Sequence, residues 1–207
     1  MKKRSAWKTI LFLIVLAFGL WVLAFAIPTG NFWIKISVSA AILASLSLLL
    51  KKGILSAFRF NTQSFIIGIS AAIILYFIFI IGRMVSLQLF GFAGEQIGDI
   101  YAKGSGTQPW VISILLFFIT GPSEEIFWRG FLQKELQECL GGWRGYLLTT
   151  SLYAGVHICS MNFILIGAAL VAGAFWGAFY WRTDNLAATI ISHSVWSTAI
   201  FAILPLL

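Results

Sequence analysis

Long apolar stretches, separated by short polar or glycine-rich breaks, run through almost the whole chain. A helix needs about 20 predominantly apolar residues to cross the hydrocarbon of a bilayer. The stretches lack the alternation of barrel strands, and each span must satisfy its own backbone hydrogen bonds in lipid. The sequence therefore predicts an all-α polytopic transmembrane helix bundle. About seven spans are expected, at 9–27, 32–50, 64–90, 109–132, 145–160, 163–181 and 186–206.

Composition supports a membrane protein and a single domain. Apolar residues make up 60% of the chain and charged residues only 10%, whereas a soluble domain has roughly 25% charged residues. The 207 residues leave no room for a separate soluble domain, so residues 1–207 are expected to form one transmembrane domain in contact with the lipid bilayer. The formal charge of +7 is spread between apolar runs, which does not indicate a nucleic-acid partner. The oligomeric state stays open.

The distribution of basic residues predicts the orientation. Lys2, Lys3 and Arg4 precede the first apolar run, which is longer than the core of a usual signal peptide and is interpreted as a retained anchor. Placing the N-terminus in the cytoplasm puts most of the basic residues on the inner side, as the positive-inside rule expects.

Two further segments are interpreted as structural. Residues 91–108 become an external loop, which is either a substrate-facing flap or a plain connector between spans, and the connector is the interpretation preferred. Gly173 and Gly177 form a GxxxG pattern, which favours close packing of two helices.

Ionisable residues inside the predicted spans are few, and each costs about 2.5 to 3.5 kcal/mol at a helix centre. Such residues usually mark function or a paired partner. Apart from groups near span ends, they are Glu124, Glu125, Arg129, His157 and His193.

The two neighbouring glutamates have different expected roles. Glu125 and Arg129 are four residues apart on one helix, so they share a face and can pair. Glu124 is rotated by about 100° from Glu125 and is left free for acid and base chemistry. Pro122 lacks an N–H and predicts a break in the helix, which indicates that water reaches Glu124.

Both histidines of the chain lie in late apolar helices. Tyr153 shares a helix face with His157 and Ser197 shares one with His193, so each hydroxyl is expected to orient one ring. Glu124, His157 and His193 can meet at one depth, and two mechanisms fit this set. Glu124 and His157 activate a water while His193, helped by Ser197, stabilises an oxyanion; or the three residues hold a Zn²⁺ with an open position.

The blocks Glu124-Glu125-x-x-x-Arg129, Tyr153-x-x-x-His157 and His193-x-x-x-Ser197, within residues 110–200, resemble the CPBP family of intramembrane proteases. That family includes CAAX prenyl endopeptidases and bacteriocin-processing or self-immunity proteins of the Abi type. The resemblance implies that Glu124 activates water, that Arg129 holds Glu125, and that His157 and His193 complete the site. Tyr153 replaces the usual Phe of the family pattern, and Ser197 replaces the usual Asn or Asp. Both metal-dependent and metal-free mechanisms are described for the family, so a zinc cofactor stays open.

The expected function is therefore hydrolysis of a peptide bond in a membrane-associated substrate, which is lipidated, leader-bearing or sorting-tagged. The expected location is a prokaryotic cytoplasmic membrane. Two alternatives are a catalytically silent family member that acts as an immunity factor or scaffold, which the Ser197 departure motivates, and a small proton-coupled transporter.

Overall fold

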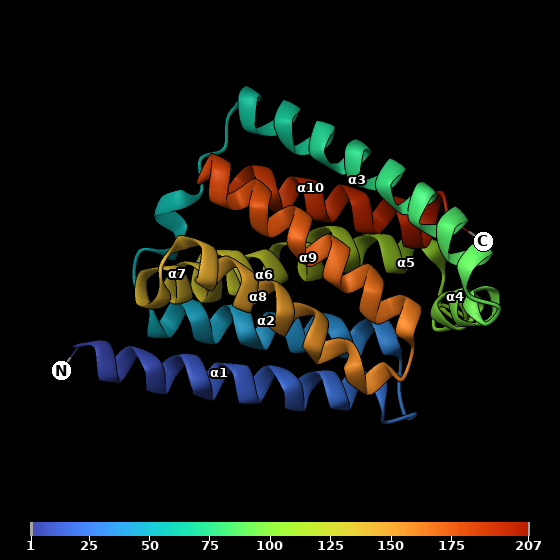
Figure 1. The fold of residues 1–207 in the computed structure, drawn as a ribbon, viewed down its shortest axis with the longest axis horizontal. Helices are drawn as coiled ribbons and strands as arrows, with labels where there is room; N and C mark the ends of the chain where they lie inside the picture. Colours follow the sequence, from blue (N-terminus) through green and yellow to red (C-terminus); the bar gives the residue numbers. More distant parts are fainter. Residues whose placement is uncertain (1, 207) are drawn as a thin grey trace.

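The structure, a computed structural model, describes residues 2–206 and the side chains of residues 6–206, and this part is built from helices (Figure 1). The side chains of Lys2, Lys3 and Arg4, on which part of the predicted orientation rests, lie outside the described residues. The helices are α1 (Lys2–Phe25), α2 (Phe32–Leu50), η1 (Ile54–Ala57), α3 (Thr62–Leu89), α4 (Ala93–Ala102), α5 (Pro109–Ile114), η2 (Leu115–Thr120), α6 (Gly121–Glu125), η3 (Ile126–Gln133), α7 (Lys134–Leu140), α8 (Gly142–Gly155), η4 (Val156–Ser160), α9 (Phe163–Thr183), α10 (Leu186–Thr198) and η5 (Ala199–Ile203).

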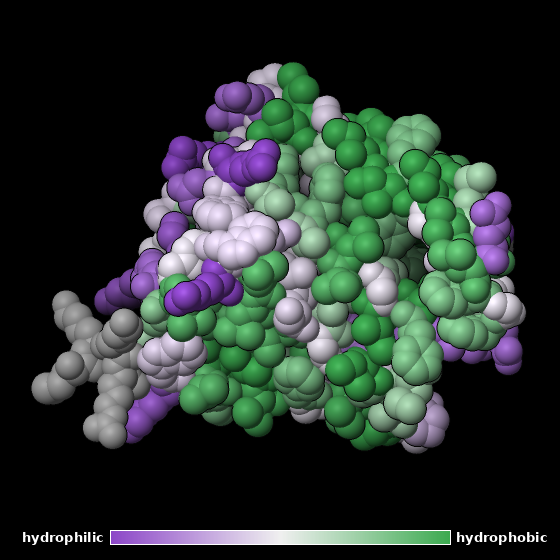
Figure 2. Space-filling model, viewed as in Figure 1, coloured by the Kyte–Doolittle hydropathy of each residue, from purple (hydrophilic) through white to green (hydrophobic). Residues whose placement is uncertain are grey.

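The all-α polytopic bundle is confirmed, and the count of long spans is one lower than predicted. Within the described residues, six helical segments are long and apolar enough to cross a membrane: 6–25, 32–50, 62–89, 109–140, 163–183 and 186–203. The segment expected at 145–160 is a shorter α8 that continues into the 3-10 turn η4. Apolar side chains cover much of the outer face (Figure 2), as a lipid-facing surface requires.

Asparagine begins four of the long helices. The side chains of Asn31, Asn61, Asn162 and Asn185 each accept a hydrogen bond from the backbone N–H three residues later. An asparagine at this position satisfies one of the N–H groups that have no partner inside a helix. These residues therefore set where α2, α3, α9 and α10 start.

The helix that carries both glutamates runs from Pro109 to Leu140 and changes its hydrogen-bond pattern around Pro122. The π-helical segment η2 precedes Pro122, and the N–H of Gly121 donates to the carbonyl of Leu116, five residues back. A second π-helical segment, η3, follows Glu125. The break predicted from Pro122 is thus taken up by wider turns on both sides of the glutamates, a feature that often accompanies functional sites.

The external loop expected at 91–108 is corrected by the structure, because most of this segment folds as the helix α4. Tyr101 on α4 donates a hydrogen bond to the carbonyl of Ile200 and accepts one from the N–H of Leu206. Burial raises the pKa of Tyr101, so the phenol stays neutral and serves in both hydrogen bonds. α4 is therefore fastened to η5 and to the C-terminal residues that follow it (Figure 1).

Ion pairs join the helices at the opposite end of the bundle, where α7 and the start of α10 lie (Figure 1). Lys51 pairs with Glu135, while Arg59 and Lys134 both lie within ion-pair distance of Asp184. The hydrogen bond to Glu135 raises the pKa of Lys51. Hydrophilic side chains gather at this end (Figure 2). That this end faces the cytoplasm stays a prediction.

Candidate active site

A cavity of about 690 Å³ lies inside the bundle, and its walls are mostly apolar. On the face shown in Figure 2 the surface is hollowed beside α4, between α3 and α9. Glu124, His157, His193 and Ser197 all line this cavity, together with Tyr153. The sequence placed the carboxylate and the two imidazoles on three different helices. The structure brings all three to the wall of one cavity.

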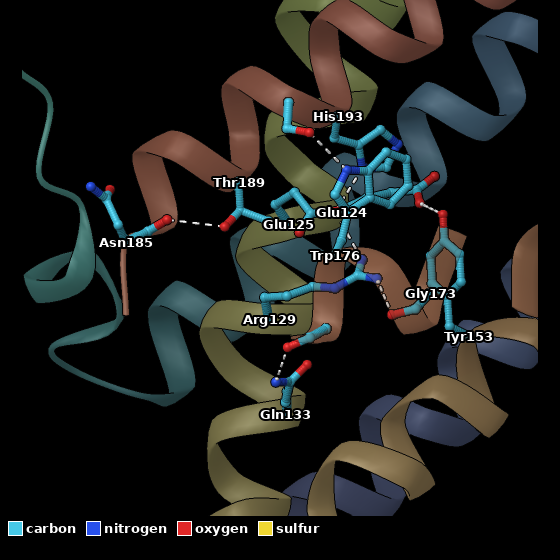
Figure 3. Close-up of polar contacts among 12 residues, drawn as sticks. Glu124, Glu125, Arg129, Gln133, Tyr153, Gly173, Trp176, Asn185, Thr189 and His193 are labelled. Carbon is cyan, nitrogen blue, oxygen red and sulfur yellow. Dashed lines mark hydrogen bonds and ion pairs between the residues drawn. The ribbon is translucent and has the colours of Figure 1, made fainter. Parts of the chain in front are cut away.

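Glu124 is 6% exposed, and its carboxylate has a hydrogen-bond donor from another helix. The hydroxyl of Tyr153 on α8 donates to Oε2 of Glu124 at 3.0 Å (Figure 3). The sequence left Glu124 without a partner, because this donor lies 29 residues away.

The neighbouring Glu125 is fully buried, and its Oε1 holds two side chains at once. Arg129 donates from Nη1 at 2.8 Å, which confirms the predicted pair. Nδ1 of His193 lies 2.6 Å from the same oxygen. The indole of Trp176 stacks on the His193 ring at 3.9 Å between centroids, with 15° between the planes. His193 is therefore held by a carboxylate on one edge and by a π-face (Figure 3).

Ser197 does not orient His193, which corrects the prediction from their spacing. Its hydroxyl donates to the backbone carbonyl of Ser194 at 3.4 Å, within its own helix. Glu125 takes the orienting role instead, because its carboxylate reaches the ring from α6.

Both ring nitrogens of His157 have partners. Nδ1 lies 2.8 Å from the carbonyl of Tyr153, and the indole N–H of Trp21 points at Nε2 at 3.4 Å. The backbone carbonyl of Tyr153 therefore orients His157, whereas the sequence predicted its hydroxyl. With a carbonyl at Nδ1, that nitrogen carries the proton and Nε2 carries the lone pair.

The GxxxG pair on α9 packs closely against α8, as predicted, and it also offers backbone acceptors. Arg129 donates from Nη2 to the carbonyl of Gly173 at 3.2 Å, and Gln133 donates to that of Gly177 at 2.9 Å. A Cβ added to Gly173 would lie 2.9 Å from Cδ1 of Tyr153. The glycines thus allow both the ring and the guanidinium to reach α9.

α4 forms part of the cavity wall. Ile97, Ile100 and Tyr101 line the cavity, and so does Lys103, the residue that follows α4. The ammonium of Lys103 lies 5.4 Å from the ring centroid of Phe25. The segment predicted as a plain connector therefore shapes the site.

The zinc alternative requires Glu124, His157 and His193 as ligands. In the part of the chain that the structure describes, no three side chains of His, Cys, Asp or Glu are grouped so that they could hold a metal ion. The arrangement does not fit a zinc ion held by these three side chains.

The residues that hold the site from a distance could not be found from spacing along the chain. The sequence relates Tyr153 only to His157, and it gives no reason to single out Trp21 or Trp176. Trp21 lies 136 residues from His157, so no spacing along the chain relates them. A buried tyrosine hydroxyl was the one available signal, since such a group needs a polar partner.

Comparison with known proteins agrees with this site. No curated protein and no solved structure matches the chain. Residues 106–199 match the family model described as type II CAAX prenyl endopeptidase Rce1-like, and this segment includes Glu124, Glu125, Arg129, His157, His193 and Ser197. The match agrees with the resemblance to CPBP proteases that the three blocks carry. The segment that carries most of the site is therefore similar to the Rce1-like type II CAAX prenyl endopeptidases, which are intramembrane proteases.

Proposed function

We propose that this protein is an intramembrane endopeptidase that cleaves a peptide bond in a membrane-associated substrate, with Glu124 as the residue that activates water. One observation carries the proposal: Glu124, His157 and His193 line a single, mostly apolar cavity. Apolar walls accommodate a lipid-proximal substrate segment, and polar groups at one place in such a cavity fix the reacting bond.

The geometry suits a general-base mechanism. The carboxylate of Glu124 takes a proton from water as the water oxygen bonds to the peptide carbonyl carbon. His157 assists as a second acceptor at Nε2, because the hydrogen bond from Trp21 is long and a water competes for it. Glu124 then passes its proton to the peptide nitrogen as the C–N bond breaks, which yields a new carboxyl group and a new amine.

His193 is assigned to the oxyanion. Its Nδ1–H is donated to Glu125, which leaves Nε2 for the cavity, and the imidazolium form donates from Nε2 to the negative oxygen of the tetrahedral intermediate. Arg129 holds Glu125 in place from the other side. Ser197 lines the same cavity, and its long bond to Ser194 can be exchanged for one to the oxyanion. No step in this mechanism requires a metal.

The test compares Glu124→Gln with wild type in cells that carry either form. Glutamine keeps the shape and cannot accept a proton, so cleavage should fall at least about 100-fold. The readout is a proteomic comparison of membrane-protein termini, in which product termini disappear with Glu124→Gln. Glu95→Gln is the matched control, because Glu95 is exposed on α4.

Termini unchanged by Glu124→Gln, with the variant inserted at the wild-type level, would overturn the proposal. That result is the one expected of a catalytically silent scaffold or immunity factor. A transporter would also leave the termini unchanged.

A further inference from the structure

Tyr153 contacts three polar parts of the site at once. Its hydroxyl donates to Glu124 at 3.0 Å, and its carbonyl lies 2.8 Å from Nδ1 of His157. The guanidinium carbon of Arg129 lies 4.8 Å from the centre of its ring. Tyr153 therefore joins the base, the first histidine and the cation that holds Glu125.

The ring of Tyr153 has little freedom to move. It is 6% exposed, and Trp128 packs edge-on against it with centroids 5.1 Å apart. On the other side, α9 comes so close that even a Cβ on Gly173 would contact Cδ1 at 2.9 Å. A ring held by Trp128, Arg129 and Gly173 places its hydroxyl at a fixed point in the cavity.

A glutamate that acts as a general base needs such a fixed hydrogen-bond donor, because the donor decides which of the two carboxylate oxygens faces the water. The last torsion of a glutamate side chain is broad, so the two oxygens of an unrestrained carboxylate exchange places easily. The hydrogen bond from Tyr153 engages Oε2 of Glu124 and leaves Oε1 to face a water. A catalytic group has to be held within about half an ångström of its productive geometry.

We infer that Tyr153 is the positioning residue of the general base, which it holds by its hydroxyl with one carboxylate oxygen free for the water. The inference rests on the proposed function of Glu124 and adds a residue to that site. It also gives the tyrosine hydroxyl a role that phenylalanine in the same place would not provide.

Tyr153→Phe tests the inference, since it removes the hydroxyl and keeps the ring that packs on Trp128 and Arg129. The substrate is a fluorogenic peptide that bears a cleavage site identified by the proteomic comparison of membrane-protein termini. With this peptide kcat should fall about tenfold, as expected for the loss of a hydrogen bond to a charged group. KM should stay within about twofold, because the ring that shapes the cavity wall is unchanged.

Tyr146→Phe is the matched control. Tyr146 lies on the same helix and donates its hydroxyl to the carbonyl of Ala174 on α9 at 3.1 Å, away from the cavity-lining groups. It should keep the wild-type kcat, and both variants should unfold in detergent within a few degrees of wild type. A merely structural hydroxyl would give the two variants the same kcat.

The inference and the proposed function fail in different ways. If Glu124→Gln still cleaves, the function of Glu124 is wrong and the role of Tyr153 falls with it. If Glu124→Gln is inactive while Tyr153→Phe keeps at least half of the wild-type kcat, or loses it only through KM, the inference alone is overturned.

Discussion

Adjacent glutamates in this site differ because of their partners. Glu125 is closed off from the cavity by Arg129 and His193, which share its Oε1. Glu124, one residue earlier and about 100° around the helix, lines the cavity instead. One turn of helix thus carries a carboxylate that pairs with neighbouring side chains and a carboxylate that the proposed mechanism uses as its base.

The buried ion pair predicts a strong effect when one partner is removed. Arg129→Met keeps much of the side-chain length and removes the charge that compensates Glu125, so the free energy of unfolding should fall by roughly 3–5 kcal/mol. Denaturant unfolding in detergent micelles measures this loss. The double variant Glu125→Gln with Arg129→Met should recover part of it, because no charge is then left buried alone. A stability for Arg129→Met within about 1 kcal/mol of wild type would contradict this account.

The N-terminal helix contributes to the site although it lies outside the segment that matches the family. α1 precedes residues 106–199, yet Trp21 is fully buried on it and directs its N–H at His157. Phe25, one turn later, packs against the same imidazole with centroids 5.7 Å apart. α1 is therefore part of the wall that orients His157.

Trp21→Phe should lower kcat by about fivefold, the size expected for loss of one neutral hydrogen bond, because the His157 ring loses the contact that orients it before a water takes its place at Nε2. Steady-state cleavage of the same fluorogenic peptide measures the effect. Trp33→Phe removes an indole from α2 that is 5% exposed, lines the same cavity and has an N–H without a hydrogen-bond partner, so kcat should fall less than in Trp21→Phe. Equal losses in the two variants would show that volume, and not the hydrogen bond to His157, matters.

The whole molecule has two unlike ends. Ion pairs of Lys51, Arg59 and Lys134 lie at one end, and α4 with Lys103 closes the other. Basic residues favour the cytoplasmic side of a membrane. The orientation proposed from the sequence therefore puts the ion-paired end inside and α4 outside.

Cysteine labelling tests this orientation. In a variant with Cys139 and Cys159 replaced by alanine, Ser105→Cys should react with a membrane-impermeant maleimide in intact cells, and Lys52→Cys only after permeabilisation. Both positions are exposed, so burial does not limit the reaction. If only Lys52→Cys is labelled in intact cells, the orientation of the protein is the opposite of the proposed one.

The sequence by itself determined which segments are helical and apolar, and it identified the polar side chains that require an explanation. It also predicted the pair of Glu125 with Arg129, because residues four apart on one helix are neighbours whatever the rest of the fold does. The cost of leaving such groups in hydrocarbon singled out Glu124, His157 and His193, and their positions along the helices permitted them to meet at one depth. The family resemblance then connected this set with peptide hydrolysis.

The partners across helices depended on the tertiary structure. His193 pairs with Glu125 across 68 residues, and Tyr153 reaches Glu124 across 29. Helical periodicity relates only positions within about one turn. Contacts between helices depend on how each helix is rotated and how closely two helices approach, and in this protein Gly173 sets one such approach. The side chains that can do chemistry could therefore be identified from the sequence. The residues that orient them could not, because those contacts depend on how α1, α6, α8, α9 and α10 pack around one cavity.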